Sequence, residues 1–260
     1  MQSEKPEKAK TRIRETKAFL HTKLFLKRIV GREIWLSADT KLNTARFGDW
    51  TACPDFLTAD SIVYSLGIGE DAAFDFELVR EKNLEVHGFD PTPNSAAWLS
   101  GQAIPGGFHF HPWAVTARDG TIAMAPRVKS NGRRSRDMYT VIDKAGASDH
   151  AIEVQTFSLQ SIMTKLGHRS IDILKMDIEG AEYDVLSSLL ATSIRPVQLL
   201  VEFHHRFPGI SKASTIDAIR DLRNAGYQIF HIADTGREMS FIKLPERGIG
   251  PQGDVSKSGL

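Results

Sequence analysis

The chain lacks the features that define several large classes of protein. Its one cysteine, Cys53, can form no internal disulfide and no C-x-x-C pair for a zinc or thioredoxin-like redox site. No stretch approaches the roughly 18 apolar residues of a membrane span, and no signal peptide is recognisable. Lys and Arg total 33 against 32 Asp and Glu, so the protein as a whole has no net charge that would attract nucleic acid or anionic lipid. Specific binding through a local basic patch is still compatible with this balance. We therefore expect a cytoplasmic protein that neither spans a membrane nor binds nucleic acid.

Three catalytic signatures are also missing: G-x-S-x-G, H-E-x-x-H and G-x-x-x-x-G-K-[ST]. Their absence leaves little support for a hydrolase. What is present is a globular composition of 260 residues, 41% hydrophobic and 25% charged. This length is enough for one large or two small domains with a substantial core.

The N-terminal segment is unusually basic. Residues 1–34 hold ten basic and four acidic side chains, a net charge of +6, and apolar residues recur among them at helical intervals. The pattern predicts an amphipathic helix over about 8–30. We expect this helix to pack on the main domain or on a second copy, forming a homodimer; binding to a membrane surface or nucleic acid is the less favoured alternative. The chain then divides into a basic helical extension (1–50), a main domain (51–246) and a flexible tail (247–260).

From residue 61 onward, short β-branched runs alternate with longer helical patterns, as in a mostly parallel α/β sheet. Strands are predicted at 62–66, 84–89, 108–115, 171–176, 197–203, 227–233 and 239–243. Helices are predicted at 72–82, 95–100, 159–166, 181–190 and 214–225. The turn at 234–236 is too short for a crossover helix, so the last two strands must pair antiparallel. The predicted fold class is α/β: a doubly wound, Rossmann-like, seven-stranded and mostly parallel sheet with a C-terminal antiparallel hairpin.

Between residues 116 and 153 the alternating pattern breaks down, and no strand is predicted there. Asp119-Gly120 has the composition of a hairpin turn, and the 127–136 segment holds a basic cluster around Asn131-Gly132, formed by Lys129, Arg133, Arg134 and Arg136. We interpret the basic cluster as a surface loop, with a lid over an anionic acceptor as the alternative.

A cofactor site is predicted where the strand at 62–66 runs into Gly67-Ile68-Gly69 and then into a helical pattern. This is where a doubly wound fold binds a nucleotide-like ligand, because glycines allow a tight turn and a close approach of backbone to ligand. Asp90 ends the next strand, 21 residues after Gly69. That spacing suits a carboxylate that accepts hydrogen bonds from two ribose hydroxyls.

The charge at this turn distinguishes between ribose-containing ligands. Glu70 and Asp71 occupy the first helical turn, where they would repel a pyrophosphate, and position 72 is alanine rather than the third glycine of the dinucleotide pattern. S-adenosylmethionine has no phosphate and carries a sulfonium and an ammonium, so acidic residues favour it. The two acids can also simply cap the helix.

A second cluster follows two neighbouring strands of the predicted sheet. Asp177 and Glu179 lie directly after the strand at 171–176, and His204 and His205 follow the strand at 197–203. Carboxyl ends of parallel strands meet at one rim of the sheet, where doubly wound folds place their chemistry. A histidine beside an acid is a plausible general base, and these side chains offer the ligands for a divalent metal. Adjacent histidines on a strand point to opposite faces, so we expect at most one of the two to join such a site unless the strand has ended. The alternative is that the acids are only turn and cap residues.

The segment around these acids resembles a known family. The residues 174–182, Leu-Lys-Met-Asp-Ile-Glu-Gly-Ala-Glu, are similar to the Leu-Lys-Ile-Asp-Val-Glu-Gly-Ala-Glu signature of FkbM-type methyltransferases, a branch of the class I S-adenosylmethionine-dependent enzymes. Further similarity lies at 89–93, 113–115, 119–120 and 200–205, and the resemblance covers about 61–243. The first glycine turn departs from the Asp-Val-Gly-Ala-Asn-Ile-Gly of many members. Trp113 stands near the position where class I enzymes often have an acid that binds adenine.

This resemblance implies a class I methyltransferase fold over 51–246, with S-adenosylmethionine as cofactor and O-methyl transfer to a hydroxyl of a small molecule or sugar. The expected cofactor contacts are Gly67, Ile68, Gly69, Glu70, Asp71, Asp90, Pro91, Trp113, Ala114 and Asp177. The expected catalytic residues are Asp177, Glu179 and His204. The alternatives are a divalent metal held by Asp177, Glu179, His204 and His205, a nicotinamide-dependent oxidoreductase, and a non-catalytic module that binds S-adenosylmethionine.

Overall fold

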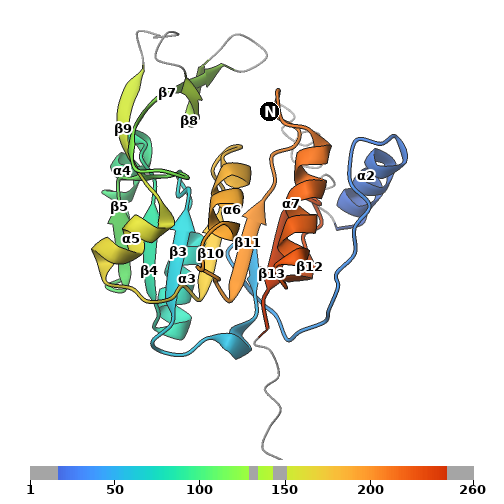
Figure 1. The fold of residues 1–260 in the computed structure, drawn as a ribbon, viewed down its shortest axis with the longest axis horizontal. Coiled ribbons are helices and arrows are strands. Elements are labelled where there is room, and N and C mark those ends of the chain that lie inside the picture. The colour runs from blue at the N-terminus through green and yellow to red at the C-terminus, as the bar shows by residue number, and fades with distance from the viewer. Residues whose placement is uncertain (1–16, 129–133, 143–150, 245–260) are drawn as a thin grey trace, which may run out of the picture.

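A computed structural model describes residues 17–128, 134–142 and 151–244, and it places a seven-stranded sheet between two layers of helices (Figure 1). The strand order is β12-β13-β11-β10-β3-β4-β5. The strands are β3 (Ile62–Leu66), β4 (Glu85–Phe89), β5 (Phe108–His111), β10 (Ile173–Met176), β11 (Gln198–Glu202), β12 (Gln228–Ile232) and β13 (Glu238–Ile242). Strands β5, β4, β3, β10 and β11 run parallel, and β13 is antiparallel to both β11 and β12. The predicted α/β class and antiparallel final pair are confirmed.

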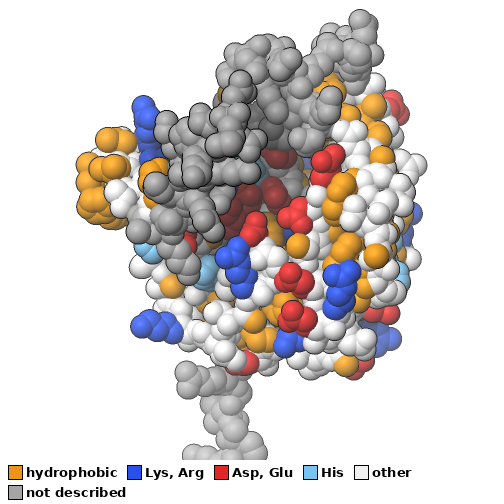
Figure 2. All heavy atoms as spheres, turned by 180° about the vertical axis from the view of Figure 1, so that it is seen from behind, with side chains coloured by type: hydrophobic (Ala, Val, Ile, Leu, Met, Phe, Trp, Pro, Cys, Tyr) orange, Lys and Arg blue, Asp and Glu red, His pale blue; other side chains and the backbone are white. Residues whose placement is uncertain are grey.

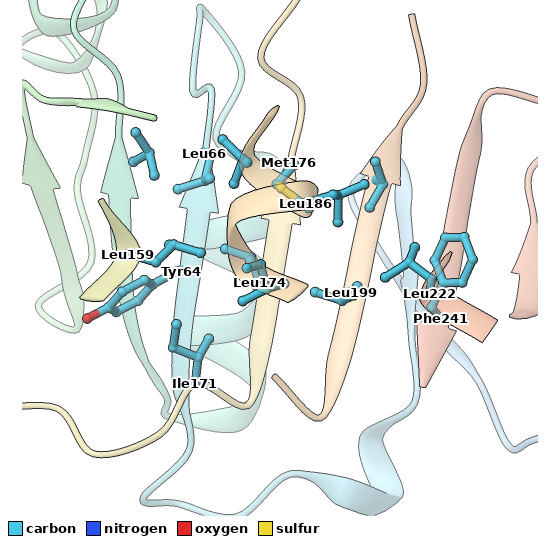
Figure 3. Packing of buried hydrophobic residues seen from close by; sticks show 14 of the residues in the cluster. Tyr64, Leu66, Leu159, Ile171, Leu174, Met176, Leu186, Leu199, Leu222 and Phe241 are labelled. Carbon is cyan, nitrogen blue, oxygen red and sulfur yellow. The ribbon is translucent and has the colours of Figure 1, made fainter. Parts of the chain in front are cut away.

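The helices cover both faces because each strand of the parallel part is buried on both sides. Helices α5 (Leu159–Leu166), α6 (Glu182–Leu190) and α7 (Lys212–Asn224) contribute to one core cluster, whose packing Figure 3 shows. Helices α3 (Ala73–Lys82) and α4 (Pro93–Leu99) contribute to the cluster on the other face. Ser158 and Ser211 cap α5 and α7 by accepting a hydrogen bond from the backbone N–H three residues on.

The seven-stranded sheet is accompanied by a second, four-stranded sheet that the sequence pattern did not predict. Its order is β6-β9-β7-β8, with β6 (Ala114–Val115), β7 (Gly120–Val128), β8 (Arg134–Ile142) and β9 (Ile152–Phe157). The prediction of one strand over 108–115 is wrong, because the chain leaves the main sheet after His111 and enters the second sheet at Ala114. The overall arrangement is thus an α/β fold in which a mixed seven-stranded sheet is accompanied by a mixed four-stranded sheet.

The predicted hairpin turn at Asp119-Gly120 is also wrong. Strand β9 lies between β6 and β7, so the two strands beside this turn do not pair with each other. Asp119 instead accepts hydrogen bonds from Ser158 N at 2.8 Å and Ser161 Oγ at 2.6 Å. It therefore fixes the start of α5. The basic cluster at 127–136 lies partly outside the described residues.

The N-terminal helix α2 (Lys17–Ile29) packs beside the β12 edge, with Leu24 buried against the turn at Gly236. Its outer face exposes Phe25, Leu26 and Ile29, and apolar side chains gather at this side of the molecule (Figure 2, left). Pairing of two copies through this helix stays a prediction. Among the helices in the described ranges, none is long and apolar enough to cross a membrane.

The segment between α2 and β3 is not a separate extension in the structure. It forms a two-stranded hairpin, β1 (Ala45–Phe47) and β2 (Trp50–Ala52), followed by a short 3-10 turn, η1 (Pro54–Phe56). Phe47 and Trp50 are buried in the same core cluster as α3. The predicted division at residue 50 therefore falls within an element that packs on the main domain. The predicted tail, 247–260, lies outside the described residues.

Candidate active site

A cavity of about 610 Å³ opens at the carboxyl ends of β3, β4 and β10. This is the topological switch point of the sheet, where open α/β folds bind ligands. Residues of the second sheet, among them Ile122 and Tyr139, close one side of the cavity. The predicted site residues that line it are Gly67, Ile68, Gly69, Asp90, Pro91, Trp113, Ala114, Asp177 and Glu179. Four others do not line it: Glu70, Asp71, His204 and His205.

The turn at Gly67 is set by a close approach of two backbones. Gly67 has a φ of +80°, and a Cβ atom there would lie 1.8 Å from the carbonyl oxygen of Asp177. The N–H of Asp177 also donates to Leu66 O at 2.9 Å. Only glycine fits this position, because any side chain would collide with the loop that carries the acids.

Lys175 stabilises the same turn through a hydrogen bond, a role that the sequence did not predict. Its Nζ donates to the carbonyl oxygen of Gly67 at 2.8 Å, although the side chain is buried in the middle of β10. The neighbouring Asp75 is fully buried, and burial raises the pKa of Asp75 to about 6 while the Lys175 charge opposes that rise. A single cation inside an otherwise apolar strand was the available signal, since buried Lys needs a partner.

Asp90 organises the glycine turn. Its Oδ2 accepts hydrogen bonds from the N–H groups of Ile68 at 3.0 Å and Gly69 at 2.9 Å. Its Oδ1 accepts from both the N–H of Thr92 at 2.8 Å and its hydroxyl at 2.6 Å. These four bonds occupy the usual acceptor positions of a carboxylate. Contact between Asp90 and a ribose therefore stays a prediction, and it requires sharing of these bonds.

Glu70 and Asp71 are exposed, outside the cavity lining. Asp71 Oδ1 accepts a hydrogen bond from Ala73 N at 2.8 Å, at the start of α3. This geometry matches the alternative that the acids cap the helix. Their predicted contact with the cofactor stays untested.

Trp113 forms a wall of the cavity. Its ring centroid lies 4.7 Å from that of His111, with the planes tilted by 31°, and 5.0 Å from that of Phe157 in an edge-on contact. The indole is half-buried, so it is held by neighbours on one side while it borders the cavity. It can offer an apolar surface to a planar ligand.

The cavity is acidic. Four carboxylates line it, from Asp90, Asp177, Glu179 and Asp184, and none of the described lining residues is Lys or Arg. Figure 2 shows several Asp and Glu side chains close together on the face that it presents. An environment of this charge favours a cationic ligand and disfavours a pyrophosphate.

His204 lies behind the cavity, not in its lining. Its Nδ1 is 2.8 Å from Glu182 Oε1, and its Nε2 is 3.7 Å from Asp177 Oδ1 and 3.8 Å from Glu202 Oε1. The ring is 5% exposed and packs against Phe207, which does line the cavity. His204 can therefore act on a ligand only through Asp177, whose side chain is 34% exposed.

Three carboxylates around one imidazole change its titration. Burial alone would lower the pKa of His204, but the hydrogen bond and charge of Glu182, with the charges of Glu202 and Asp177, raise this pKa above its ordinary value. Burial, and then the Asp177 charge, raise the pKa of Glu202 to about 7, against the opposing charge of Arg237, whose Nη1 lies 2.6 Å away. The raised pKa favours the protonated form of His204 beside the Asp177 carboxylate, and a histidine that holds its proton more tightly is a weaker base.

Glu182 is the second functional residue that the sequence analysis missed. Its side chain is fully buried from solvent, and its Oε1 also accepts hydrogen bonds from the backbone N–H groups of Ile178 at 3.0 Å and Gly180 at 3.2 Å. These bonds fold the 177–180 loop, in which Glu179 has a left-handed φ of 53°. Such a conformation is uncommon for a non-glycine residue and persists where surrounding bonds enforce it. An acid in the first turn of a helix was the available signal.

The predicted four-residue metal set is wrong in one member. Ligand atoms of Asp177, Glu179 and His204 lie within 4.8 Å of one another. His205 points away: its Nε2 is 3.2 Å from Glu33 Oε2, and its Nδ1 is 3.3 Å from Thr215 Oγ1. Both histidines lie beyond the end of β11, and different partners hold their rings, Glu182 for His204 and Glu33 for His205. Metal binding by the remaining three residues stays untested.

Comparison with known proteins identifies the family. Residues 59–229 match the model of the methyltransferase FkbM domain, so the chain belongs to this methyltransferase family. The human "Probable methyltransferase-like protein 24" is 28% identical over 214 residues, and the rat protein of the same name is 27% identical over 213 residues. Each alignment covers 75% of this chain and 51% of the relative. The chain thus spans about half the length of the curated relatives it matches.

Two solved structures give a weaker likeness. The methyltransferase FkbM from Methylobacillus flagellatus has a TM-score of 0.43 at 11% identity, covering 72% of this chain and 44% of that chain. The Methanococcus jannaschii fibrillarin pre-rRNA processing protein has a TM-score of 0.44 at 9% identity, covering 81% and 86%. With TM-scores below 0.5, neither structure carries an inference about this chain.

Proposed function

We propose that this domain is an S-adenosylmethionine-dependent methyltransferase that methylates a hydroxyl of a small molecule or sugar. The observation that carries the cofactor assignment is the charge of the cavity: four carboxylates line it, and no Lys or Arg does among the described residues. S-adenosylmethionine is cationic at its sulfonium and ammonium, whereas a nicotinamide dinucleotide carries two phosphates that would lie against these acids. The oxidoreductase alternative is therefore disfavoured.

We assign the parts of the cavity by chemistry. Trp113 and Ala114 would border the adenine, Asp90 and Pro91 the ribose, and the turn from Gly67 to Gly69 the remaining part of the cofactor. A volume of about 610 Å³ lies within the usual range for a ligand site and leaves room for a small acceptor. A cytoplasmic setting, inferred from the single cysteine, is part of the same proposal.

Asp177 is the residue that we assign to the reacting centre. When bound, S-adenosylmethionine supplies a methyl group on a positively charged sulfur, which leaves as the neutral thioether while the acceptor oxygen bonds to carbon. The Asp177 carboxylate borders the cavity and can take the hydroxyl proton from the acceptor. His204, whose Nδ1 lies 2.8 Å from Glu182 and whose Nε2 lies 3.7 Å from Asp177, would orient the Asp177 carboxylate. The walls exclude water and align the acceptor, which supplies most of the rate in such a displacement.

Label transfer tests this proposal. The wild-type protein, given S-adenosylmethionine labelled in the methyl group, should label a small-molecule fraction of a cell extract. Asp177→Asn keeps the shape but weakens the base, so labelling should fall by about 10²-fold or more while S-adenosylhomocysteine binding changes little. Asp217→Asn, an exposed acid on α7, serves as the matched control and should label normally.

Two results would count against the proposal. If Asp177→Asn labels as fast as the wild type, the base lies elsewhere or the acceptor needs none. If the wild type binds S-adenosylhomocysteine but labels nothing in any fraction, the alternative of a non-catalytic binding module is favoured.

A further inference from the structure

Histidines from two strands and one helix end converge at the β5 edge of the main sheet, away from the acidic cavity. His87 lies on β4 and His111 on β5, and His168 follows α5. The ring centroid of His87 is 4.6 Å from that of His168 and 5.3 Å from that of His111. Glu85, two residues before His87 on the same face of β4, brings a carboxylate whose Oε2 is 3.9 Å from His87 Nε2.

Two of these imidazoles are each held by one nitrogen. His87 Nδ1 is hydrogen-bonded to His111 Nε2 at 3.0 Å, and His168 Nδ1 to the Tyr64 hydroxyl at 2.8 Å. Figure 3 shows the Tyr64 oxygen directed away from the apolar residues around its ring. In both histidines this arrangement leaves Nε2 as the atom that can face a ligand. An imidazole fixed through its other nitrogen is the usual arrangement around a protein-bound metal.

The Nε2 atom of His87 is the strongest sign that something is bound here. It is buried, and it has no hydrogen-bond partner among the residues that the structure describes. A buried polar atom without a partner costs about 1–3 kcal/mol, so its retention needs an explanation.

We propose that Glu85, His87 and His168 bind a divalent transition-metal ion, with zinc as the best match. One carboxylate and two imidazole nitrogens form a common zinc donor set with a fourth position open to water. The three ligand atoms already lie within 4.8 Å of one another. Zinc bonds of about 2.0–2.2 Å require them to approach further, which Glu85 and His168 can do because both are partly or fully exposed.

The ion would tie the end of α5 to strand β4, and it would not take part in methyl transfer. Glu85 begins β4, and the cavity is lined by the last residue of this strand, Phe89, on the order of 13 Å along the strand from Glu85. The Asp177, Glu179 and His204 group is the weaker candidate, because Asp177 and Glu179 line the cavity that we assign to the cofactor and the acceptor. We therefore place the ion at the histidine cluster.

Zinc titration tests the site. The full chain, stripped with a chelator and dialysed, is titrated with zinc chloride in a calorimeter and melted with and without zinc. The wild type should bind one ion at this site and gain thermal stability. The double variant Glu85→Gln with His168→Gln should bind at least about 10²-fold more weakly and lose the gain. His109→Gln, an exposed ring that stacks on His87 but is not in the donor set, should behave as the wild type.

Two further measurements keep the result interpretable. Unchanged far-UV circular dichroism and S-adenosylhomocysteine affinity in the double variant would show that its loss of zinc is local. The variant His204→Gln should retain the zinc site, because it removes only the other donor group. Equal zinc affinity in the double variant and the wild type, loss of zinc in His204→Gln alone, or no zinc binding by the wild type would overturn the proposal.

Discussion

The Nδ1 of His204 lies 2.8 Å from the Oε1 of Glu182, and both side chains are buried behind the cavity rather than in its lining. The pair joins the loop after β10 to the end of β11, because Glu182 also binds the N–H groups of Ile178 and Gly180. The position of Asp177 at the cavity thus depends on two residues that no ligand needs to touch. We therefore propose that His204 positions Asp177 rather than acting as the general base.

Replacement of His204 by glutamine should lower methyl transfer by about 10²-fold while S-adenosylhomocysteine binding stays nearly intact, because Asp177 loses its partner. A pH series separates this role from a loss of packing. Since the folded-state pKa of His204 is raised, its stabilising effect is complete below its ordinary value of 6.5 and is lost as pH rises through the higher folded value.

The free energy of unfolding should therefore differ between wild type and His204→Gln by on the order of 2 kcal/mol at pH 6, and by less at pH 9. Denaturant titration at the two pH values measures this. A difference of equal size at both would mean that the imidazolium contributes nothing and that His204 is only packed.

The two glycines of the turn should differ in their tolerance of a methyl group. Gly67→Ala should prevent cofactor binding and destabilise the fold, because the new Cβ would collide with the Asp177 carbonyl at 1.8 Å. In Gly69→Ala the new Cβ would have no neighbouring atom within 4 Å. This variant should therefore lose only on the order of 1 kcal/mol of folding free energy, which is what a left-handed φ of 56° costs a residue with a side chain. Thermal melts with and without S-adenosylhomocysteine compare the variants, and equal behaviour of the two would refute the close approach.

Asp90→Asn should lower both the stability of the unliganded protein and its affinity for the cofactor product. Asparagine cannot accept all four hydrogen bonds that the Asp90 carboxylate accepts from Ile68, Gly69 and Thr92, so the unliganded melting temperature should fall. Affinity for S-adenosylhomocysteine should fall by about 1.5–3 kcal/mol, as expected for charged hydrogen bonds. Asp217→Asn, an exposed acid on α7 outside the cavity lining, is the control. Loss of affinity with an unchanged melting temperature would show that Asp90 serves the ribose and not the turn.

The sequence was most informative where one local pattern decided the outcome. The strand at 62–66 and the helix at 159–166 have the predicted bounds. Each was marked by a signal within its own segment: a run of β-branched residues for the strand, and an N-cap serine followed by apolar residues at helical spacing for the helix. The strands β7 and β8 were missed, since Pro126 and small residues interrupt the alternation that marks a strand.

The sequence predicted which loops form the candidate site, but it did not predict which side chains pair with each other there. The acids after β10 and the glycines after β3 were found from their place beside strand ends. The bond between Glu182 and His204 joins residues 22 positions apart, and the direction of each histidine depends on packing that spacing does not encode. The orientation of His205 toward Glu33 is a further case.

The central claim is that the acidic cavity, whose described lining residues include no Lys or Arg, binds S-adenosylmethionine and not a dinucleotide. Calorimetric titration of the wild-type chain with S-adenosylhomocysteine and, separately, with NAD tests it most directly. The account predicts saturable binding of S-adenosylhomocysteine at one site per chain, lost in Gly67→Ala, and no measurable heat with NAD. Saturable binding of NAD with no response to S-adenosylhomocysteine would contradict it and favour the oxidoreductase alternative.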